Sequence, residues 1–380
     1  SIAGINFGTI VLLSRSGGAE FKGLCTQIAA LASVAQIASE IGGGAVIVKM
    51  AQNKRVVKLF LFNLAIITIL SLITATYAIN TTHELRLLSL TFLVCAFASL
   101  TSFIGYYCLS KQAIHIYNLI NFSQPFVMLI ILMLYKNSLS FSVFMFSFAI
   151  SYAVSFLIGI LYFIIQAKKD ANLEELKYNE ISRHSLIAIA SHFGGFVTQR
   201  LLYFILPFFI LGVFSNAISV AESALIVANS LCTYLFSKLS SIDDLKQQVS
   251  LTKSYIKINL AVLLFGYVLI LFIPAGFYVF FFGDDFSEVG NIMKYAFPGV
   301  IFNSVHLIIG HFFSSKANFK INLFFTLTGF VGTLLFTILF ALNKELLNLY
   351  SAAIMYSGSY FLVFLVAVYS FIKQSRVVHE

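Results

Sequence analysis

The chain has 380 residues, of which 59% are hydrophobic and only 10% are charged, and its formal net charge is +9. A soluble domain of this size would carry roughly 25% charged residues and could not keep this much apolar surface from water. The composition therefore excludes a soluble globular protein and predicts an integral membrane protein.

Long apolar runs without polar alternation predict transmembrane helices. A helix needs about 20 residues to cross the hydrocarbon core, and helices satisfy their own backbone hydrogen bonds there. We predict an all-α polytopic membrane protein, with about twelve transmembrane helices in two six-helix lobes around a central cavity. The first helix is expected to be truncated, because the chain starts at Ser1 within an apolar run. The predicted helices cover residues 1–13, 22–48, 57–79, 87–109, 113–135, 139–166, 184–212, 217–240, 254–282, 292–315, 319–342 and 346–372.

The basic residues of the predicted loops support this helix count. When the loops are assigned alternately to the two faces of the membrane, most of the loop cations fall on one face. Lys and Arg accumulate in cytoplasmic loops, so this pattern predicts a multi-pass protein with both termini in the cytoplasm. The positive charge then faces lipid headgroups, and no nucleic-acid partner is expected. The loops predicted to lie outside hold Arg15, Lys22, Arg86, Lys136 and Lys344.

One polar stretch divides the chain into halves. It reads "QAKKDANLEELKYNEISR" and follows the sixth predicted helix. Its loose apolar stripe predicts a short amphipathic helix on the cytoplasmic surface. The predicted organisation is an N-terminal lobe at 1–166, a linker at 167–183 and a C-terminal lobe at 184–380. Predicted helices 2 and 8 are faintly similar, which suggests two related halves with a substrate site between them.

All four prolines fall within predicted helices, where a proline removes a backbone donor and bends the helix. In the helix at 184–212, Gly194 and Gly195 lie on one side of Arg200 and Pro207 on the other, so we expect a bend there. The remaining prolines are Pro125, Pro274 and Pro298.

Arg200 lies at the centre of this predicted helix. An embedded Arg costs roughly 2.5 kcal/mol or more and cannot lose its proton. It therefore marks either an anion site in a watery cavity, with a planar fork suited to phosphate oxygens, or a structural ion pair. We assign Arg200, with His192 and Gln199 on the same helix, to a substrate-binding cavity. His192 can equally be a packed histidine.

Two carboxylates, Glu40 and Glu222, are also embedded in predicted helices. Each is a candidate coupling-ion site or counter-ion. With a hairpin turn near Ser215 and straight helices at 1.5 Å per residue, Arg200 and Glu222 would differ in depth by roughly 12 Å. A direct pair is therefore not expected, and Glu40 is the better partner for Arg200. The glycines after it, 42–44, would permit close helix packing.

No motif in the sequence predicts an enzyme, a metal site or a cofactor site. His306 and His311 are five residues apart, about 140° around a helix, and cannot easily share a metal. The acidic segment "FFGDDFSEVGN" at 281–291 is typical of a turn that enters a helix. The cysteines lie in apolar segments without metal-ligand spacing, which predicts buried thiols at Cys25, Cys95, Cys108 and Cys232.

Two longer stretches carry a family resemblance. They are "SRSGGAEFKGLCTQIAALASVAQIASEIGGGAVIVK" and "FFGDDFSEVGNIMKYAFPGVIFNSVHLIIGHFFSSKANFKINLF". Together with the twelve predicted helices and the central linker, they resemble the polysaccharide transporters of the multidrug/oligosaccharidyl-lipid/polysaccharide superfamily, in particular O-antigen-type flippases. The resemblance extends over nearly the whole chain.

This resemblance implies a flippase of the bacterial plasma (inner) membrane, in the pathway of O-antigen and lipopolysaccharide synthesis. It implies a polyprenyl-diphosphate-linked oligosaccharide, moved from the cytoplasmic to the outer leaflet by alternating access. Membrane lipid and the glycan polymerase or chain-length machinery are the implied partners. Arg200 would hold the diphosphate or an acidic sugar, with Arg15 and Lys294 near the outer mouth. Cations are few, so a neutral glycan with a loosely held headgroup fits equally well.

Two other functions compete with the flippase. A cation-coupled drug or small-molecule antiporter of the same superfamily would use acidic residues in one lobe, and Glu40 and Glu222 could serve. A membrane enzyme such as a glycan polymerase would carry a sizeable outer loop, whereas the outer loops here are about a dozen residues or shorter, a common length for plain connections. The sequence favours a transporter.

Overall fold

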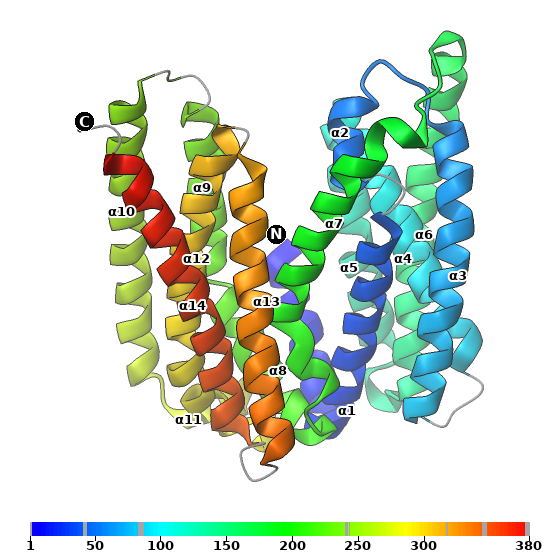
Figure 1. Cartoon of the computed structure of the whole chain (residues 1–380). Coiled ribbons are helices and arrows are strands. Elements are labelled where there is room, and N and C mark those ends of the chain that lie inside the picture. The colour runs from blue at the N-terminus through cyan, green and yellow to red at the C-terminus, as the bar shows by residue number, and fades with distance from the viewer. Residues whose placement is uncertain are drawn as a thin grey trace. The chain divides into compact units, whose positions relative to one another are not determined.

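The computed structural model describes residues 2–40, 44–82, 87–239, 242, 244–316, 318–343 and 348–376 (Figure 1). These residues are mainly helical, so the predicted all-α membrane fold is confirmed. The helices are α1 (Ile2–Ser39), α2 (Ile47–Met50), α3 (Val57–Thr82), α4 (Leu87–Ser110), α5 (Ile114–Leu134), α6 (Phe141–Lys169), α7 (Tyr178–Arg200), α8 (Phe208–Glu222), α9 (Leu225–Leu239), α10 (Leu245–Phe272), α11 (Ala275–Phe282), α12 (Val289–Ser315), α13 (Phe319–Leu342) and α14 (Leu349–Arg376).

Eight helices in the described part of the chain are long and apolar enough to cross a membrane, or up to nine if α8 and α9, bent by 40°, form one broken span. Helix α7 is outside this set, and so is α1, which joins the first two predicted helices. The join is a kink at Gly18, whose φ of 73° is a left-handed conformation that glycine adopts without steric cost.

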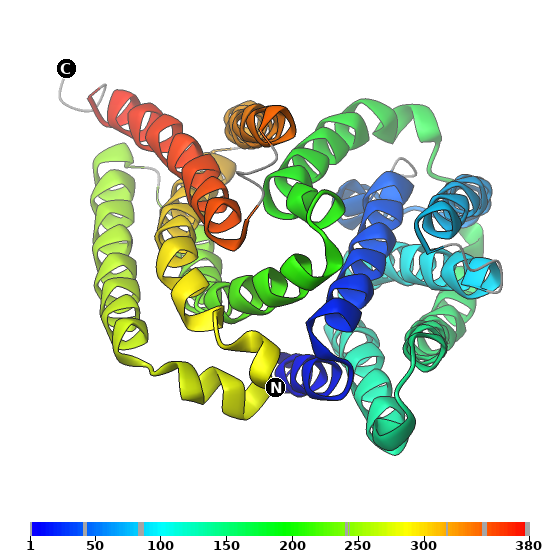
Figure 2. The ribbon, with the colours of Figure 1, turned by 90° about the horizontal axis from the view of Figure 1, so that it is seen from below.

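The chain divides into two compact units, Ser1–Phe193 and Gly194–Glu380. The division falls inside α7 and not in the stretch at 167–183. Each unit is built around one central helix. In the first unit α4 packs against α1, α3, α5 and α6, and in the second α12 packs against α8, α9, α10, α13 and α14 (Figure 2). Both central helices are fourth in their predicted six-helix half.

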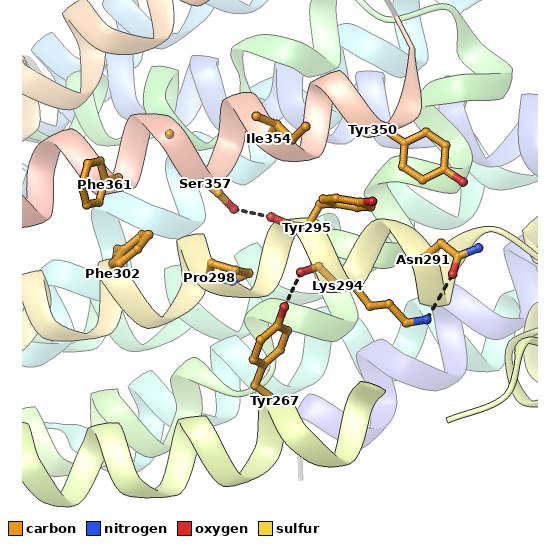
Figure 3. Close-up of a pocket in the computed structure, with 11 residues that line it drawn as sticks. Tyr267, Asn291, Lys294, Tyr295, Pro298, Phe302, Tyr350, Ile354, Ser357 and Phe361 are labelled. Atoms are coloured by element: carbon orange, nitrogen blue, oxygen red, sulfur yellow. Dashed lines mark hydrogen bonds between the residues drawn. The ribbon is translucent and has the colours of Figure 1, made fainter. Parts of the chain in front are cut away.

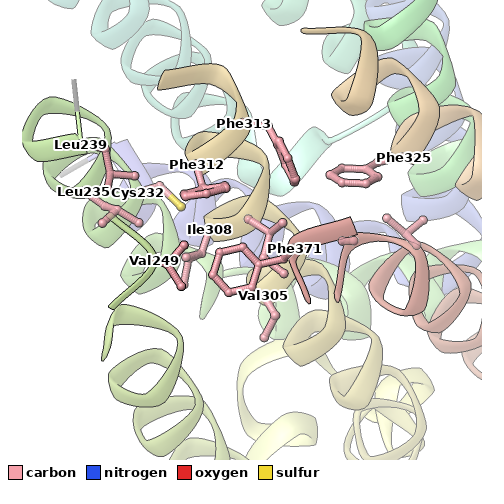
Figure 4. Packing of buried hydrophobic residues seen from close by; sticks show 13 residues of the cluster. Cys232, Leu235, Leu239, Val249, Val305, Ile308, Phe312, Phe313, Phe325 and Phe371 are labelled. Atoms are coloured by element: carbon pink, nitrogen blue, oxygen red, sulfur yellow. The ribbon is translucent and has the colours of Figure 1, made fainter. Parts of the chain in front are cut away.

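The core of the second unit is a cluster of aliphatic and aromatic side chains around α12 (Figure 4). Phe312 of α12 contacts Phe371 of α14 through an edge-on ring pair, and Phe313 contacts Phe325 of α13 in the same way. Cys232 of α9 is buried in the same cluster. All four cysteines are buried, as predicted.

Two prolines begin helices where the sequence prediction placed them inside helices. Pro207 is the N-cap of α8 and Pro274 is the N-cap of α11, so the predicted helices at 184–212 and 254–282 are each broken. Proline suits a helix start because its missing N–H has no intrahelical partner there. Pro125 and Pro298 do lie inside helices, as predicted.

The prediction of a short amphipathic helix in the linker at 167–183 is wrong. Helix α6 continues to Lys169, a single 3₁₀ turn covers Asp170–Asn172, and the chain then runs extended to α7. The extended part pairs with the loop before α3: the Arg55 N–H donates to the Glu174 carbonyl at 2.9 Å, and the Leu176 N–H donates to the Arg55 carbonyl at 2.7 Å. Backbone pairing and the burial of Leu176 replace the surface helix.

A buried ion pair stabilises this junction. Lys111 Nζ lies 2.7 Å from an Asp170 carboxylate oxygen, and the two side chains are only 6% and 8% exposed. The Asp170 carboxylate also accepts hydrogen bonds from Tyr107 and Gln166, and the ammonium donates to the Gln52 carbonyl. The pair therefore joins the end of α6 to α4 and to the loop before α3.

We expect Asp170→Asn to destabilise the first unit by about 3 kcal/mol, because it leaves the Lys111 ammonium buried without its counter-ion. The measurement is the thermal unfolding midpoint of the purified chain in detergent. Glu174→Gln is the matched control, since this neighbour is exposed and contributes its backbone carbonyl to the pairing. Equal midpoints for the two variants would contradict the role given to the ion pair.

Candidate functional site

The break between α7 and α8 places Arg200 at a helix end. Helix α7 ends at Arg200, a 3₁₀ turn covers Leu201–Phe204, and Pro207 starts α8. Helix α8 then runs without interruption through Ser215, which is buried. The expected hairpin turn near Ser215 is therefore absent, and the chain changes direction at 201–207.

The guanidinium of Arg200 binds Glu222. Its Nη2 lies 2.5 Å from Oε2 and its Nη1 lies 3.3 Å from Oε1, which is the two-pronged geometry of a strong Arg–carboxylate pair. The side chains are 24% and 14% exposed. The expectation that these residues would not pair is wrong, because the depth estimate assumed straight helices and a turn at Ser215. Glu222 has the counter-ion role.

Aromatic side chains surround this pair. The Tyr203 hydroxyl accepts a hydrogen bond from Arg200 Nη1 at 2.8 Å, and the guanidinium lies 5.0 Å from the centre of the Tyr203 ring. Tyr356 of α14 donates to Glu222 Oε1 at 2.9 Å. Tyr360, one turn further along α14, contacts Tyr356 edge-on. Gln199, which precedes Arg200 on α7, is half-buried. The embedded cation is thus neutralised and bordered by tyrosines.

Glu40 belongs to a separate cluster within the first unit. Its carboxylate lies 2.6 Å from His192 Nδ1 through one oxygen and accepts the Tyr106 hydroxyl at 3.0 Å through the other. Glu40 is 7% exposed and His192 is 42% exposed. A carboxylate and an imidazole at this distance are joined by a hydrogen bond, and the tautomer of the imidazole sets which group donates.

Gly44 is needed beside this carboxylate. Its φ is +43°, and a Cβ at this position would lie 2.7 Å from Glu40 Cβ and 2.9 Å from Oε2. The backbone therefore approaches Glu40 more closely than any other residue would allow. The expected role of this glycine run in close packing applies to Gly44, while residues 42 and 43 lie outside the described residues.

Tyr106 also lines a small polar cavity of about 180 Å³ in the first unit. Its walls come from α1, α4, α5 and α6, and they carry the hydroxyls and amides of Ser102, Asn121, Gln124 and Tyr152. Water suits a cavity of this size and polarity. The Glu40 cluster therefore adjoins a space that can be hydrated.

The two cations predicted near an outer mouth differ in setting. Arg15 is exposed on α1, three residues before the kink. Lys294 of α12 lines a groove of about 830 Å³ between α10, α12 and α14 (Figure 3). No sequence pattern identifies the tyrosines that contact the Arg200–Glu222 and Glu40–His192 clusters. Tyrosines are spread over many apolar segments, and only packing brings particular ones close to a charge.

No protein-family model matches the chain, and no curated protein matches it either. Solved structures do match. A multidrug-resistance MATE family transporter of the MOP superfamily, in an inward-facing conformation, aligns with 100% of this chain and 95% of its own, with a TM-score of 0.65 and 11% identity. The lipid II flippase MurJ aligns over 99% of this chain and 88% of its own, with a TM-score of 0.67 and 14% identity.

This chain has the fold of these membrane transporters. A mutant of the Vibrio cholerae MATE transporter VcmN agrees with this over 99% of the chain and 93% of its own, with a TM-score of 0.60 and 10% identity. At these identities the similarity establishes the architecture. The ligand chemistry of this chain depends on its own side chains, among them the Arg200–Glu222 and Glu40–His192 clusters.

Glu222→Gln should destabilise the second unit by about 3 kcal/mol, since it strands a partly buried guanidinium. The double variant Arg200→Met/Glu222→Met should recover much of that loss, because both charges leave together. Thermal unfolding of wild type, Arg200→Met, Glu222→Met and the double variant gives the interaction energy as a double-mutant cycle, with Glu222→Gln measured beside it. Strictly additive losses would show that the two charges do not support each other.

Gly44→Ala should lower the unfolding midpoint, at a cost of about 1–3 kcal/mol, because alanine is strained at this φ and its methyl group would displace Glu40. Gly276→Ala is the control. It lies in α11, where nothing is within 4 Å of an added Cβ, and alanine is the better helix former. If both variants unfold at the wild-type temperature, Gly44 is not required beside Glu40.

Proposed function

We propose that the chain is a flippase that moves a polyprenyl-diphosphate-linked oligosaccharide, of the O-antigen type, to the outer leaflet of a bacterial plasma membrane by alternating access. The fold shared with a lipid II flippase supports a lipid-linked substrate. The observation that carries the choice within the superfamily is the neutral pair of Arg200 and Glu222 with its tyrosines.

A neutral, tyrosine-bordered site suits a sugar better than a cationic drug. Tyrosine rings offer flat faces to sugar rings, and their hydroxyls donate and accept hydrogen bonds. A cationic substrate needs an available carboxylate, and both oxygens of Glu222 already accept hydrogen bonds from Arg200. These contacts disfavour a drug-cation site at Glu222.

Arg200 can also act on the diphosphate. Two oxygens of a tetrahedral phosphate can accept both N–H groups of the guanidinium, as the two carboxylate oxygens do, so a phosphate would compete with Glu222 for Arg200. Exchange from Glu222 to phosphate keeps the embedded guanidinium paired throughout, while the Glu222 carboxylate keeps the hydrogen bond from Tyr356. Glu222 would then return to Arg200 when the headgroup leaves.

A cation-coupled antiporter is the alternative, and the Glu40–His192 contact favours it. A buried carboxylate bonded to a half-exposed imidazole is suited to proton uptake. In the flippase, the same cluster would instead bind the coupling ion. The predicted orientation, with both termini in the cytoplasm, belongs to this proposal, as does an association with glycan polymerase or chain-length machinery.

The test is complementation of a strain that lacks its own O-antigen flippase but synthesises the lipid-linked repeat unit. Expression of this chain should restore surface glycan. Arg200→Ala should reduce it by about tenfold or more, the factor that a loss of 1.4 kcal/mol produces. Lys136→Ala, an exposed change between α5 and α6, is the matched control.

Three quantities should be measured in the same cells: the surface glycan, the protein level, and the amount of lipid-linked repeat unit that remains in the cytoplasmic leaflet. Wild-type glycan in the Arg200→Ala strain at normal protein level would remove Arg200 from the transport site. Failure of the unaltered chain to restore glycan, with a gain of drug resistance that Glu40→Gln abolishes, would favour the antiporter.

A further inference from the structure

The groove between α10, α12 and α14 is a second candidate binding site, separate from the Arg200 and Glu40 clusters. Its volume is about 830 Å³. Asn291, Lys294, Pro298 and Phe302 line it from one face of α12, and Tyr350 and Phe361 mark its two ends on α14 (Figure 3). All of these residues belong to the second unit, so the groove is complete within it.

The floor of the groove is the proline kink of α12. Pro298 has no N–H, so the Lys294 carbonyl loses its intrahelical partner, and Tyr267 of α10 donates its hydroxyl to that carbonyl at 2.9 Å. Ser357 of α14 donates to the Tyr295 carbonyl at 2.6 Å and accepts from the Gly299 N–H at 3.1 Å. Side chains from both walls thus satisfy the opened backbone, which gives the groove a preformed shape.

Polarity changes along the groove. Both α12 and α14 begin at its polar end, and eleven residues separate Asn291 from Phe302 and Tyr350 from Phe361, roughly 16 Å of helix. The deeper part is apolar and open, with Ile354 53% exposed and Phe361 41% exposed. A polar end that leads into an exposed apolar channel matches an amphiphile with its headgroup at the start of α12.

The polar end carries Lys294 and Asn291, and the Asn291 amide connects Lys294 to Glu288, the N-cap residue of α12 beside the groove. Lys294 Nζ donates to Asn291 Oδ1 at 3.3 Å, and Asn291 Nδ2 donates to Glu288 Oε2 at 3.1 Å. The same Glu288 oxygen accepts the Tyr350 hydroxyl at 2.6 Å. An ammonium has three donors and a carboxylate about four acceptor sites, so both groups retain capacity for a ligand.

We propose that this groove binds a zwitterionic phospholipid with a phosphoethanolamine headgroup. The phosphate contacts Lys294, the headgroup ammonium donates to Glu288, and an acyl chain lies along Ile354 and Phe361. A choline headgroup has no N–H to donate to Glu288. A glycerol headgroup leaves the lipid with a net negative charge beside that carboxylate.

The local charges make a polyprenyl diphosphate a poorer occupant of this groove than the zwitterionic phospholipid. Glu288 and, in the turn before α12, Asp284 repel a headgroup with several negative charges. The inference does not rest on the proposed transport function. It places a structural or regulatory lipid at α12, the helix around which the second unit is packed.

The experiment is native mass spectrometry of the full chain released from nanodiscs that contain equal amounts of phosphatidylethanolamine, phosphatidylglycerol and phosphatidylcholine. Wild type should retain phosphatidylethanolamine at least tenfold over each of the other lipids. Lys294→Gln should lose this retention about tenfold. Glu288→Gln should lose it as well and gain phosphatidylglycerol, because the repelling carboxylate is gone.

Two further variants keep the test decisive. Lys257→Gln removes an exposed cation elsewhere, on α10, and should bind as wild type does. Ile354→Trp fills the apolar channel without altering any charge and should also lose phosphatidylethanolamine, which covers the case in which Lys294→Gln does not fold. Equal retention of the three lipids by wild type would overturn the proposal, as would displacement of phosphatidylethanolamine by equimolar undecaprenyl diphosphate.

Discussion

The contact between Arg200 and Glu222 is the constraint on which the second unit depends. A guanidinium within apolar segments must find a counter-ion, and here it finds one 22 residues further along the chain. The chain makes that contact with its helix interrupted between α7 and α8. The 3₁₀ turn at 201–204 and Pro207 at the start of α8 supply the bend. Tyr356 then ties α14 to the same carboxylate.

The same rule, that polar groups within the helical units must find partners there, explains the other irregular parts of the fold. Pro298 frees backbone groups of α12, and hydroxyls from α10 and α14 bind them. Asp170 ends α6 close to α4, and Lys111 neutralises it. In each case a local departure from regular helix is stabilised by a side chain from another helix.

The two charge clusters differ in their burial and in their partners. Arg200 and Glu222 form a paired site whose charges cancel, bordered by tyrosines. Glu40 is more deeply buried, while its partner His192 is half-exposed, and Tyr106 connects the cluster to a polar cavity. The first cluster places tyrosine hydroxyls around a paired charge, and the second joins a buried carboxylate to an imidazole. Each lies within a single unit, although His192 and Arg200 belong to the same helix, α7.

Composition and hydropathy by themselves determined that the chain is an all-helical membrane protein with buried cysteines. They also placed most helices, because a continuous apolar run of about 20 residues has few alternatives in a bilayer. The partner of Arg200, the path of the linker and the roles of Pro207 and Pro274 were decided only by tertiary structure. Straight helices would hold Arg200 and Glu222 apart, and a bend of a few residues changes which side chains meet. Contacts between distant segments depend on such bends, which local sequence patterns do not specify.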